Sequence, residues 1–110
     1  MKVIIAGGRT FNDLGALDRA IEASGFEITE VITGGARGAD TLAIRWAKAH
    51  DIPVSVYWAQ WDIYGKRAGP LRNWRMTQFA EALIALPGGL GTADMIMQAR
   101  RKGLPVFEAS

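Results

Sequence analysis

The sequence predicts an α/β protein built on a doubly wound, mainly parallel sheet of five strands with helices on both faces. Three observations lead to this prediction. Short apolar runs alternate with segments of helical periodicity along the whole chain. The runs are continuous and rich in β-branched residues, as in strands buried on both faces. Glycine-rich turns follow three of them, as in sheets that bind ligands at the carboxyl ends of their strands. With no linker or low-complexity tract, residues 1–110 are expected to form one domain.

The expected strands are the runs of high apolar content. Pro53 stands at the first position of the third strand, a place where strands tolerate proline. In chain order the strands are expected at Lys2–Ala6, Val31–Thr33, Pro53–Trp58, Ala82–Leu86 and Pro105–Glu108.

The first two helices are predicted from their capping residues and their periodicity. Asn12 is expected to cap a helix that Gly25 ends, because Leu14 and the apolar residues after it recur at helical spacing. The second helix is expected from about Thr41 to His50, with Asp40 as its N-cap.

The last two helices follow turns that contain glycine. Proline suits the first helical position, so Gly69-Pro70 is expected to begin the third helix. This helix is expected to turn Leu71, Trp74 and Phe79 inward, while the segment Gln60–Gly69 before it is expected to be irregular. The fourth helix is expected to run through about Lys102, where its cationic end suits the helix dipole.

The composition excludes several kinds of site. The chain has no cysteine, which rules out disulfides, thiolate metal sites and cysteine nucleophiles. With one histidine, a histidine-based metal site is not expected, and no cofactor or metal is predicted. No apolar run approaches the roughly 20 residues of a membrane helix, so no membrane partner is expected. A strand that begins at Lys2 leaves no room for a signal peptide, and a cytoplasmic location is expected.

The stretch Ala82–Asp94 carries the clearest functional signal. A strand-length run meets the turn Pro87–Thr92, and a helical pattern follows directly. In a parallel sheet this order brings backbone N–H groups and a helix N-terminus to the carboxyl end of the strand. Glycines in the turn let a ligand approach the backbone. The turn therefore predicts a phosphate cradle, and the alternative is a tight turn that uses glycine only for its dihedral angles.

Basic residues gather at the same edge of the predicted sheet. The net charge of +2 is too small to indicate a partner by itself, so the position of the charges matters more. Clustering at the ligand edge favours an anion with more than one charge. Neither G-x-x-x-x-G-K-[ST] nor G-x-G-x-x-G after the first strand is present, which disfavours a P-loop triphosphatase and the usual dinucleotide fingerprint. The basic residues at this edge are Arg9, Arg37, Lys66, Arg67 and Arg72.

The motifs together resemble the SLOG superfamily, in particular its small YspA/YpsA-like branch, over essentially the whole chain. They are Gly7-Gly8-Arg9-x-Phe11, Gly34–Asp40, Tyr64-Gly65-Lys66 with Ala68–Asn73, and Gly88-Gly89-x-Gly91-Thr92. The resemblance implies a Rossmann-like sheet and a pocket for a small nucleotide or nucleotide-derived ligand. The ligand-binding residues are then expected to be Gly7, Gly8, Arg9, Gly34, Gly35, Ala36, Arg37, Gly38, Asp40, Lys66, Arg72, Asn73, Gly88, Gly89, Gly91 and Thr92.

Enzymatic activity is left open at this point. The Lonely Guy phosphoribohydrolases, a related branch, share the motif P-G-G-x-G-T-x-x-E, whose glutamate acts in catalysis. Here Pro87–Thr92 match, but Met95 stands where the glutamate is expected, and a thioether cannot take a proton. Asp94 lies one residue earlier, about 100° around the helix. No catalytic residue is therefore assigned.

Two further kinds of partner are considered. Thr33–Asp40 also resembles a turn of DprA-type proteins, which bind single-stranded DNA, and aromatic residues beside basic ones suit stacked bases. Nucleic acid is thus an alternative ligand to a small nucleotide. Related SLOG proteins commonly assemble, and the aromatic residues around Trp58–Tyr64 are candidates for an interface, so a homo-oligomer is expected.

Overall fold

The computed structural model describes residues 1–109 and contains a five-stranded sheet in which every pair of neighbouring strands is parallel. The strand order is β3-β2-β1-β4-β5, so the chain starts in the middle of the sheet and winds outward in both directions. This confirms the predicted doubly wound fold. The strands are β1 (Lys2–Ala6), β2 (Glu30–Thr33), β3 (Val54–Val56), β4 (Ala82–Ala85) and β5 (Val106–Glu108).

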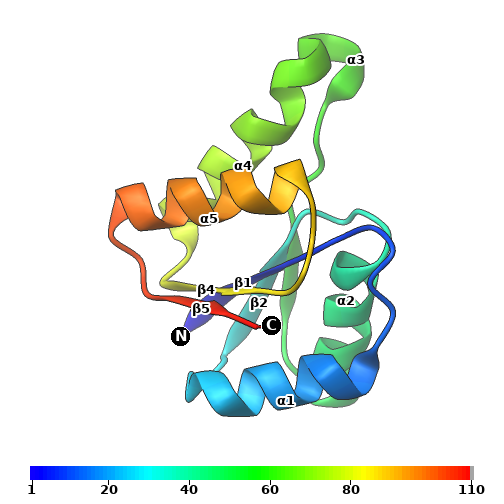
Figure 1. The fold of residues 1–110 in the computed structure, drawn as a ribbon, viewed down its shortest axis with the longest axis vertical. Coiled ribbons are helices and arrows are strands. Elements are labelled where there is room, and N and C mark those ends of the chain that lie inside the picture. The colour runs from blue at the N-terminus through cyan, green and yellow to red at the C-terminus, as the bar shows by residue number, and fades with distance from the viewer. Residues whose placement is uncertain (110) are drawn as a thin grey trace.

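Helices cover both faces of the sheet, as Figure 1 shows, with α1 and α2 on one side and α4 and α5 on the other. The short helix α3 and the 3₁₀ turn η1 stand beyond α4, away from the sheet (Figure 1). No helix within residues 1–109 is long and apolar enough to cross a membrane. The helical elements are α1 (Leu14–Ser24), α2 (Ala39–Ala49), α3 (Trp61–Tyr64), η1 (Gly65–Arg67), α4 (Ala68–Phe79) and α5 (Leu90–Lys102).

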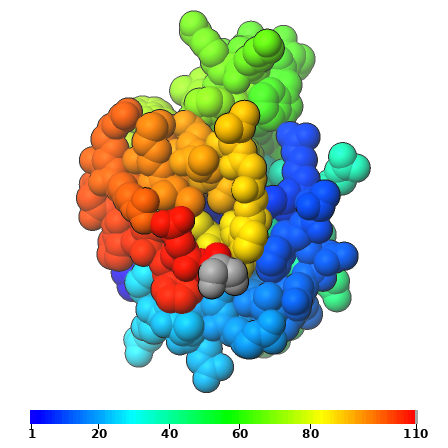
Figure 2. Space-filling view, in the orientation of Figure 1, coloured from blue at the N-terminus to red at the C-terminus, as the bar shows by residue number. Residues whose placement is uncertain are grey.

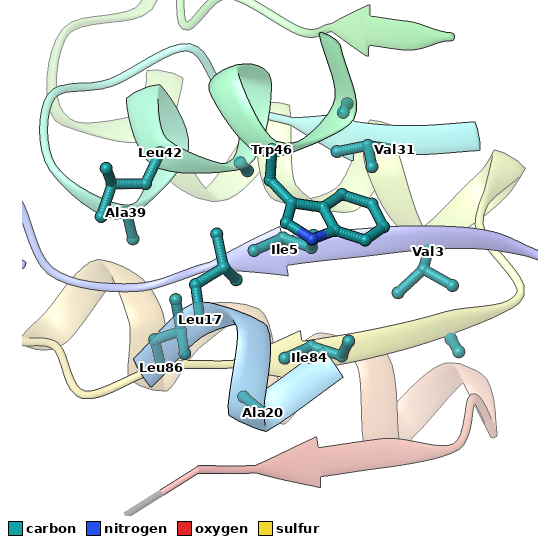
Figure 3. Packing of buried hydrophobic residues seen from close by; sticks show 13 residues of the cluster. Val3, Ile5, Leu17, Ala20, Val31, Ala39, Leu42, Trp46, Ile84 and Leu86 are labelled. Carbon is teal, nitrogen blue, oxygen red and sulfur yellow. The ribbon is translucent and has the colours of Figure 1, made fainter. Parts of the chain in front are cut away.

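The sheet separates two apolar clusters. Alternate residues of β1 explain this division, because Ile5 packs with α1 and α2 while Ile4 packs with α4 and α5. Trp46 is 8% exposed and lies over the sheet near Ile5 and Val31, as Figure 3 shows. Burying a large aliphatic side chain contributes about 1.5–3 kcal/mol. The two clusters therefore fix both helix layers on the central strands.

Helix α4 differs from the prediction in the face it buries. Trp74 and Phe79, which were expected to point inward, are 52% and 57% exposed. The buried face carries Asn73, Met76 and Thr77 instead. The Thr77 hydroxyl donates a 2.6 Å hydrogen bond to the carbonyl of Trp74, which satisfies it inside the fold. The large aromatic residues of α4 therefore do not mark its inner face, which combines Met76 with polar side chains.

The helix starts also need correction. Asp13, not Asn12, caps α1, and its carboxylate accepts a 3.0 Å bond from the N–H of Ala16. The N-cap of α2 is Gly38, so Asp40 lies within the first helical turn. Helix α4 begins at Ala68, just before the predicted Gly69-Pro70 start, because the segment ahead of it is already helical as α3 and η1.

Candidate functional site

A cavity of about 540 Å³ opens beyond the carboxyl ends of β1, β2 and β4. This is the edge where the sheet reverses its winding direction, the usual ligand position in open α/β sheets. Four segments line it: the turn after β1, the turn after β2, the region from α3 to α4, and the start of α5. The lining residues are Ala6, Gly7, Gly8, Arg9, Gly34, Ala36, Asp40, Trp61, Lys66, Gly69, Pro70, Arg72, Asn73, Met76, Gly89, Leu90, Gly91, Thr92, Asp94 and Met95.

The turns after β1 and β4 are bonded directly to each other. The N–H of Gly8 donates to the carbonyl of Pro87 at 2.8 Å, and the carbonyl of Gly8 accepts from the N–H of Ala39 at 3.1 Å. A Cβ on Gly7 would lie only 2.7 Å from the Cβ of Ala39 and 2.8 Å from that of Leu86. Glycine at this position lets the first turn pass between α2 and the end of β4.

The start of α5 presents backbone donors to the cavity. The N-cap is Gly89, whose missing side chain provides no capping hydrogen bond. Within residues 1–109, the N–H groups of Leu90, Gly91 and Thr92 have no hydrogen-bond partner. A Cβ added at Gly89 or at Gly91 would meet no atom within 4 Å, so these glycines leave space rather than relieve crowding. Free N–H groups at a helix N-terminus beside open space form a site that favours an anion.

A chain of side-chain hydrogen bonds forms the opposite wall. Arg72 donates from Nη1 to the carbonyls of Gly34 (2.9 Å) and Tyr57 (3.4 Å), and from Nε to Oδ1 of Asn73 (3.0 Å). Its two Nη2 hydrogens have no partner among residues 1–109. The guanidinium is thus fixed between β2 and α4 with one amino group still available.

This series of side-chain hydrogen bonds continues from α4 to Asp94 on α5. The amide nitrogen of Asn73 donates to Oδ2 of Asp94 at 2.9 Å, and Gln98 donates to the same oxygen at 2.8 Å. Asn73 also reaches the carbonyl of Gly91 at 3.3 Å. These bonds hold the Asp94 carboxylate in the cavity wall. They also explain why the polar side chain of Asn73 lies on the buried face of α4.

Asp40 and Arg72 place opposite charges close to each other in the cavity lining. Asp40 is 7% exposed, and its Oδ2 accepts a 3.0 Å bond from the N–H of Ala36, which closes the turn after β2. Burial raises the pKa of Asp40 above its ordinary value of 3.8, although the Ala36 N–H and the Arg72 charge oppose this rise. Burial also lowers the pKa of Arg72, against the attraction of Asp40, but arginine remains protonated.

The raised pKa of Asp40 predicts a pH effect on stability. A folded-state pKa above the unfolded value means that the folded protein binds the proton more tightly, so this contribution is lost as the pH rises through the folded pKa. Asp40→Asn cannot ionise. The free energy of unfolding of this variant, relative to wild type, should therefore increase between about pH 4 and about pH 7. Urea unfolding at both pH values measures the difference, with Asp62→Asn on exposed α3 as the control. A relative stability of Asp40→Asn that falls with pH would contradict the account.

The structure brings together twelve of the sixteen predicted site residues. Gly7, Gly8, Arg9, Gly34, Ala36, Asp40, Lys66, Arg72, Asn73, Gly89, Gly91 and Thr92 all line the cavity.

The other four, Gly35, Arg37, Gly38 and Gly88, do not line it. The three glycines have packing roles instead. A Cβ on Gly35 would meet the Trp58 ring at 2.5 Å, one on Gly38 would overlap the Gly8 carbonyl, and one on Gly88 would lie 2.7 Å from the Gly8 nitrogen. Arg37 is exposed on the turn outside the cavity.

Sequence reasoning missed part of the lining. Trp61, Leu90 and Asp94 all line the cavity but were not assigned to the site. The sequence did offer a reason to assign Asp94 to the site, because it lies within the span of the phosphoribohydrolase motif. Its contact with α4, however, depends on tertiary packing. Met95, at the position of the hydrolase glutamate, is 1% exposed and packs in the cluster with Ile4. Within residues 1–109, no group of three or more potential ligands is placed to hold a metal.

Comparisons with known proteins agree with the fold. The model of the YspA, cpYpsA-related SLOG family matches residues 1–64. The Gene 61 protein of Mycobacterium phage D29 is 34% identical over 118 aligned residues, which cover 96% of this chain and 94% of that protein. The X-ray structure of TM1055, a structural genomics target, has a TM-score of 0.71 at 18% identity, covering 96% of this chain and 71% of that one. This last similarity shows the Rossmann-like fold alone.

Proposed function

Because the chain belongs to the YspA, cpYpsA-related SLOG family, we propose that its cavity binds a nucleotide or nucleotide-derived ligand through a phosphate group. The observation that carries this proposal is the first turn of α5. Its N–H groups at Leu90, Gly91 and Thr92 have no partner within residues 1–109, and they face a cavity that two glycines leave open. A phosphate at this position would accept these hydrogen bonds and gain from the helix dipole.

The cationic side chains of the cavity support the same ligand. Arg9, Lys66 and Arg72 line it, and the free amino group of Arg72 is held by bonds made through the rest of its guanidinium. A guanidinium fixed in this way loses little freedom when it binds a phosphate oxygen. Since Arg37 lies outside the lining, it is no longer part of the proposed site.

The size of the cavity fits a small ligand. Its volume of about 540 Å³ lies within the range of roughly 300–1,000 Å³ that is usual for small-molecule sites. The half-buried carboxylate of Asp94 faces the same space and is a candidate acceptor for ribose hydroxyls. The walls therefore combine donors for a phosphate with an acceptor for a sugar.

A thermal-shift panel tests the proposal. We expect AMP or another nucleoside monophosphate to raise the melting temperature, while adenosine, which lacks the phosphate, does not. At a hundred times its dissociation constant, a ligand stabilises the folded state by about 2.7 kcal/mol. For a domain of this size that corresponds to a shift of roughly 10 °C. Equal shifts with AMP and adenosine would contradict recognition through phosphate, and no shift with any monophosphate would reject the proposal.

Hydrolysis of the N-glycosidic bond is a second candidate, and Asp94 is the observation that favours it. Its Oδ1 has no hydrogen-bond partner within residues 1–109, because both amide donors bind Oδ2. We nevertheless favour binding without turnover, since Met95 stands at the glutamate position and is buried. The AMP samples of the same panel distinguish the two. Free adenine that Asp94→Asn abolishes would establish the hydrolase instead.

Binding of single-stranded DNA remains the alternative from another class. Trp58, Trp61 and Trp74 are 66%, 49% and 52% exposed, and Arg67 and Arg75 are exposed near them in the sequence. Such a surface suits stacked bases. Salt-sensitive binding of an oligonucleotide, without any shift by a mononucleotide, would favour this function over the proposed one.

A further inference from the structure

Trp61 is the only aromatic side chain among the cavity-lining residues within 1–109. It lies on α3, a helix with no buried residue, in the segment that Figure 2 shows in green, projecting from the body of the molecule. Its side chain is 49% exposed. A large aromatic surface left in water at a cavity wall gains stability when a flat apolar partner covers it.

Gly69 accounts for the position of the indole. A Cβ built on this residue would lie 3.1 Å from Cη2 of Trp61, tighter than an ordinary contact. The benzene edge of the indole therefore rests against the first turn of α4, so close that an alanine at position 69 would require the ring to shift by a few tenths of an ångström. Both residues line the cavity. The ring is thus supported from the protein side while half of its surface stays open.

The lining of the cavity consists of parts that differ in chemistry. The start of α5 carries backbone donors, and Arg72, Asn73 and Asp94 form a polar wall. Trp61, together with Leu90, which is 92% exposed, provides the exposed apolar surface of the lining. A ligand that matches all of these parts has an anionic group, polar groups and a flat aromatic group.

We propose that Trp61 stacks on the base of the bound nucleotide and so selects base-bearing phosphates over simple sugar phosphates. This inference rests on the proposed function, because it assigns the base end of the same ligand. Stacking on an aromatic side chain tolerates any base, since every base has a π-face. Trp61 is therefore a determinant of ligand class and not of base identity.

Paired ligands and paired variants test this role. Removal of a stacking ring weakens base binding by about 5- to 150-fold. We expect Trp61→Ala to weaken AMP by a factor in this range and to leave ribose 5-phosphate unchanged, measured by isothermal titration. Trp61→Phe should retain part of the affinity for AMP. Trp74→Ala, which removes an indole of similar exposure outside the cavity, is the control and should leave AMP unchanged.

Fluorescence gives a second readout that a merely structural role would not change. In a Trp58→Phe, Trp74→Phe background, Trp61 and the buried Trp46 are the remaining indoles. AMP should quench the emission of the exposed indole, and ribose 5-phosphate should not.

The outcomes separate the two proposals. If Trp61→Ala weakens AMP and ribose 5-phosphate equally, or weakens neither, the stacking role is wrong while the phosphate site stands. An equal loss with Trp74→Ala, or no quenching by AMP, would also overturn it. If wild type binds neither ligand, the proposed function itself fails.

Discussion

Replacement of Gly38 by alanine is expected to lower the free energy of unfolding by more than about 3 kcal/mol. Gly38 has a φ of +78°, a left-handed conformation that costs a residue with a Cβ roughly 1–3 kcal/mol. The added Cβ would also overlap the carbonyl oxygen of Gly8 and lie 2.5 Å from the carbonyl carbon of Arg9. Both contacts are with backbone, and the Gly8 carbonyl accepts a hydrogen bond from Ala39 of α2, so no flexible side chain can move aside. Urea unfolding measures the loss.

Two glycine variants serve as matched controls for Gly38→Ala. Gly103 has a similar φ of +85°, but a Cβ there would have no atom within 4 Å, so Gly103→Ala should cost only the backbone strain, about 1 kcal/mol. Gly91 has neither a positive φ nor a neighbour in that space, and Gly91→Ala should leave stability unchanged or slightly raised. A Gly38→Ala variant as stable as Gly103→Ala would contradict the packing described for this turn.

Arg72→Ala is expected to lower the free energy of unfolding by about 2–4 kcal/mol. The substitution removes the donors to Gly34, Tyr57 and Asn73 and leaves the Asp40 carboxylate without its neighbouring positive charge. Arg72→Lys keeps the charge but not the planar set of donors, so it should recover only part of the loss. Thermal and urea unfolding of the three proteins measure the order of stability.

A double-mutant cycle with Gly34 makes the Arg72 test sharper. A Cβ on Gly34 would overlap Nη1 of Arg72 and lie 2.6 Å from its Cζ. Gly34→Ala should therefore destabilise wild type but have a smaller effect when Arg72 is already alanine. If the two losses simply add, the two residues do not contact each other as described.

The sheet could be predicted from the sequence because its strands are continuous apolar runs. The β-branched residues of Lys2–Ala6 and the apolar residues of Ala82–Ala85 are typical of strands buried on both faces, and the glycine-rich turns between strand and helix place the cavity edge. Nine of the twelve predicted residues that line the cavity lie in these turns or at the start of the helix that follows, whereas Lys66, Arg72 and Asn73 come from η1 and α4. Gly35, Gly38 and Gly88 fall outside the cavity although they belong to the same glycine-rich turns. A glycine in the sequence does not tell whether it makes room for a ligand, for a neighbouring segment or for a positive φ.

The parts that could not be predicted depend on contacts between helices. The inner face of α4 carries Asn73, which meets Asp94 of α5, beside the apolar Met76, while Trp74 is exposed and gives a misleading apolar signal. Helix α3 has no buried residue and too few turns to show a periodicity, so Trp61 could not be assigned to the cavity. Asp94 was set aside for lying one position before the expected glutamate. Only the arrangement of α4 against α5 brings its carboxylate to the cavity.

Titration of AMP into wild type and Gly91→Ala is the most direct test of the phosphate site. Gly91 lies in the first turn of α5 and lines the cavity, and a Cβ added there would meet no protein atom within 4 Å. We therefore expect the added methyl group to crowd a phosphate held at this turn. We expect Gly91→Ala to unfold like wild type and to bind AMP at least about tenfold more weakly, a loss of about 1.4 kcal/mol. Wild-type affinity for AMP in a correctly folded Gly91→Ala variant would contradict the central claim that the start of α5 holds the phosphate.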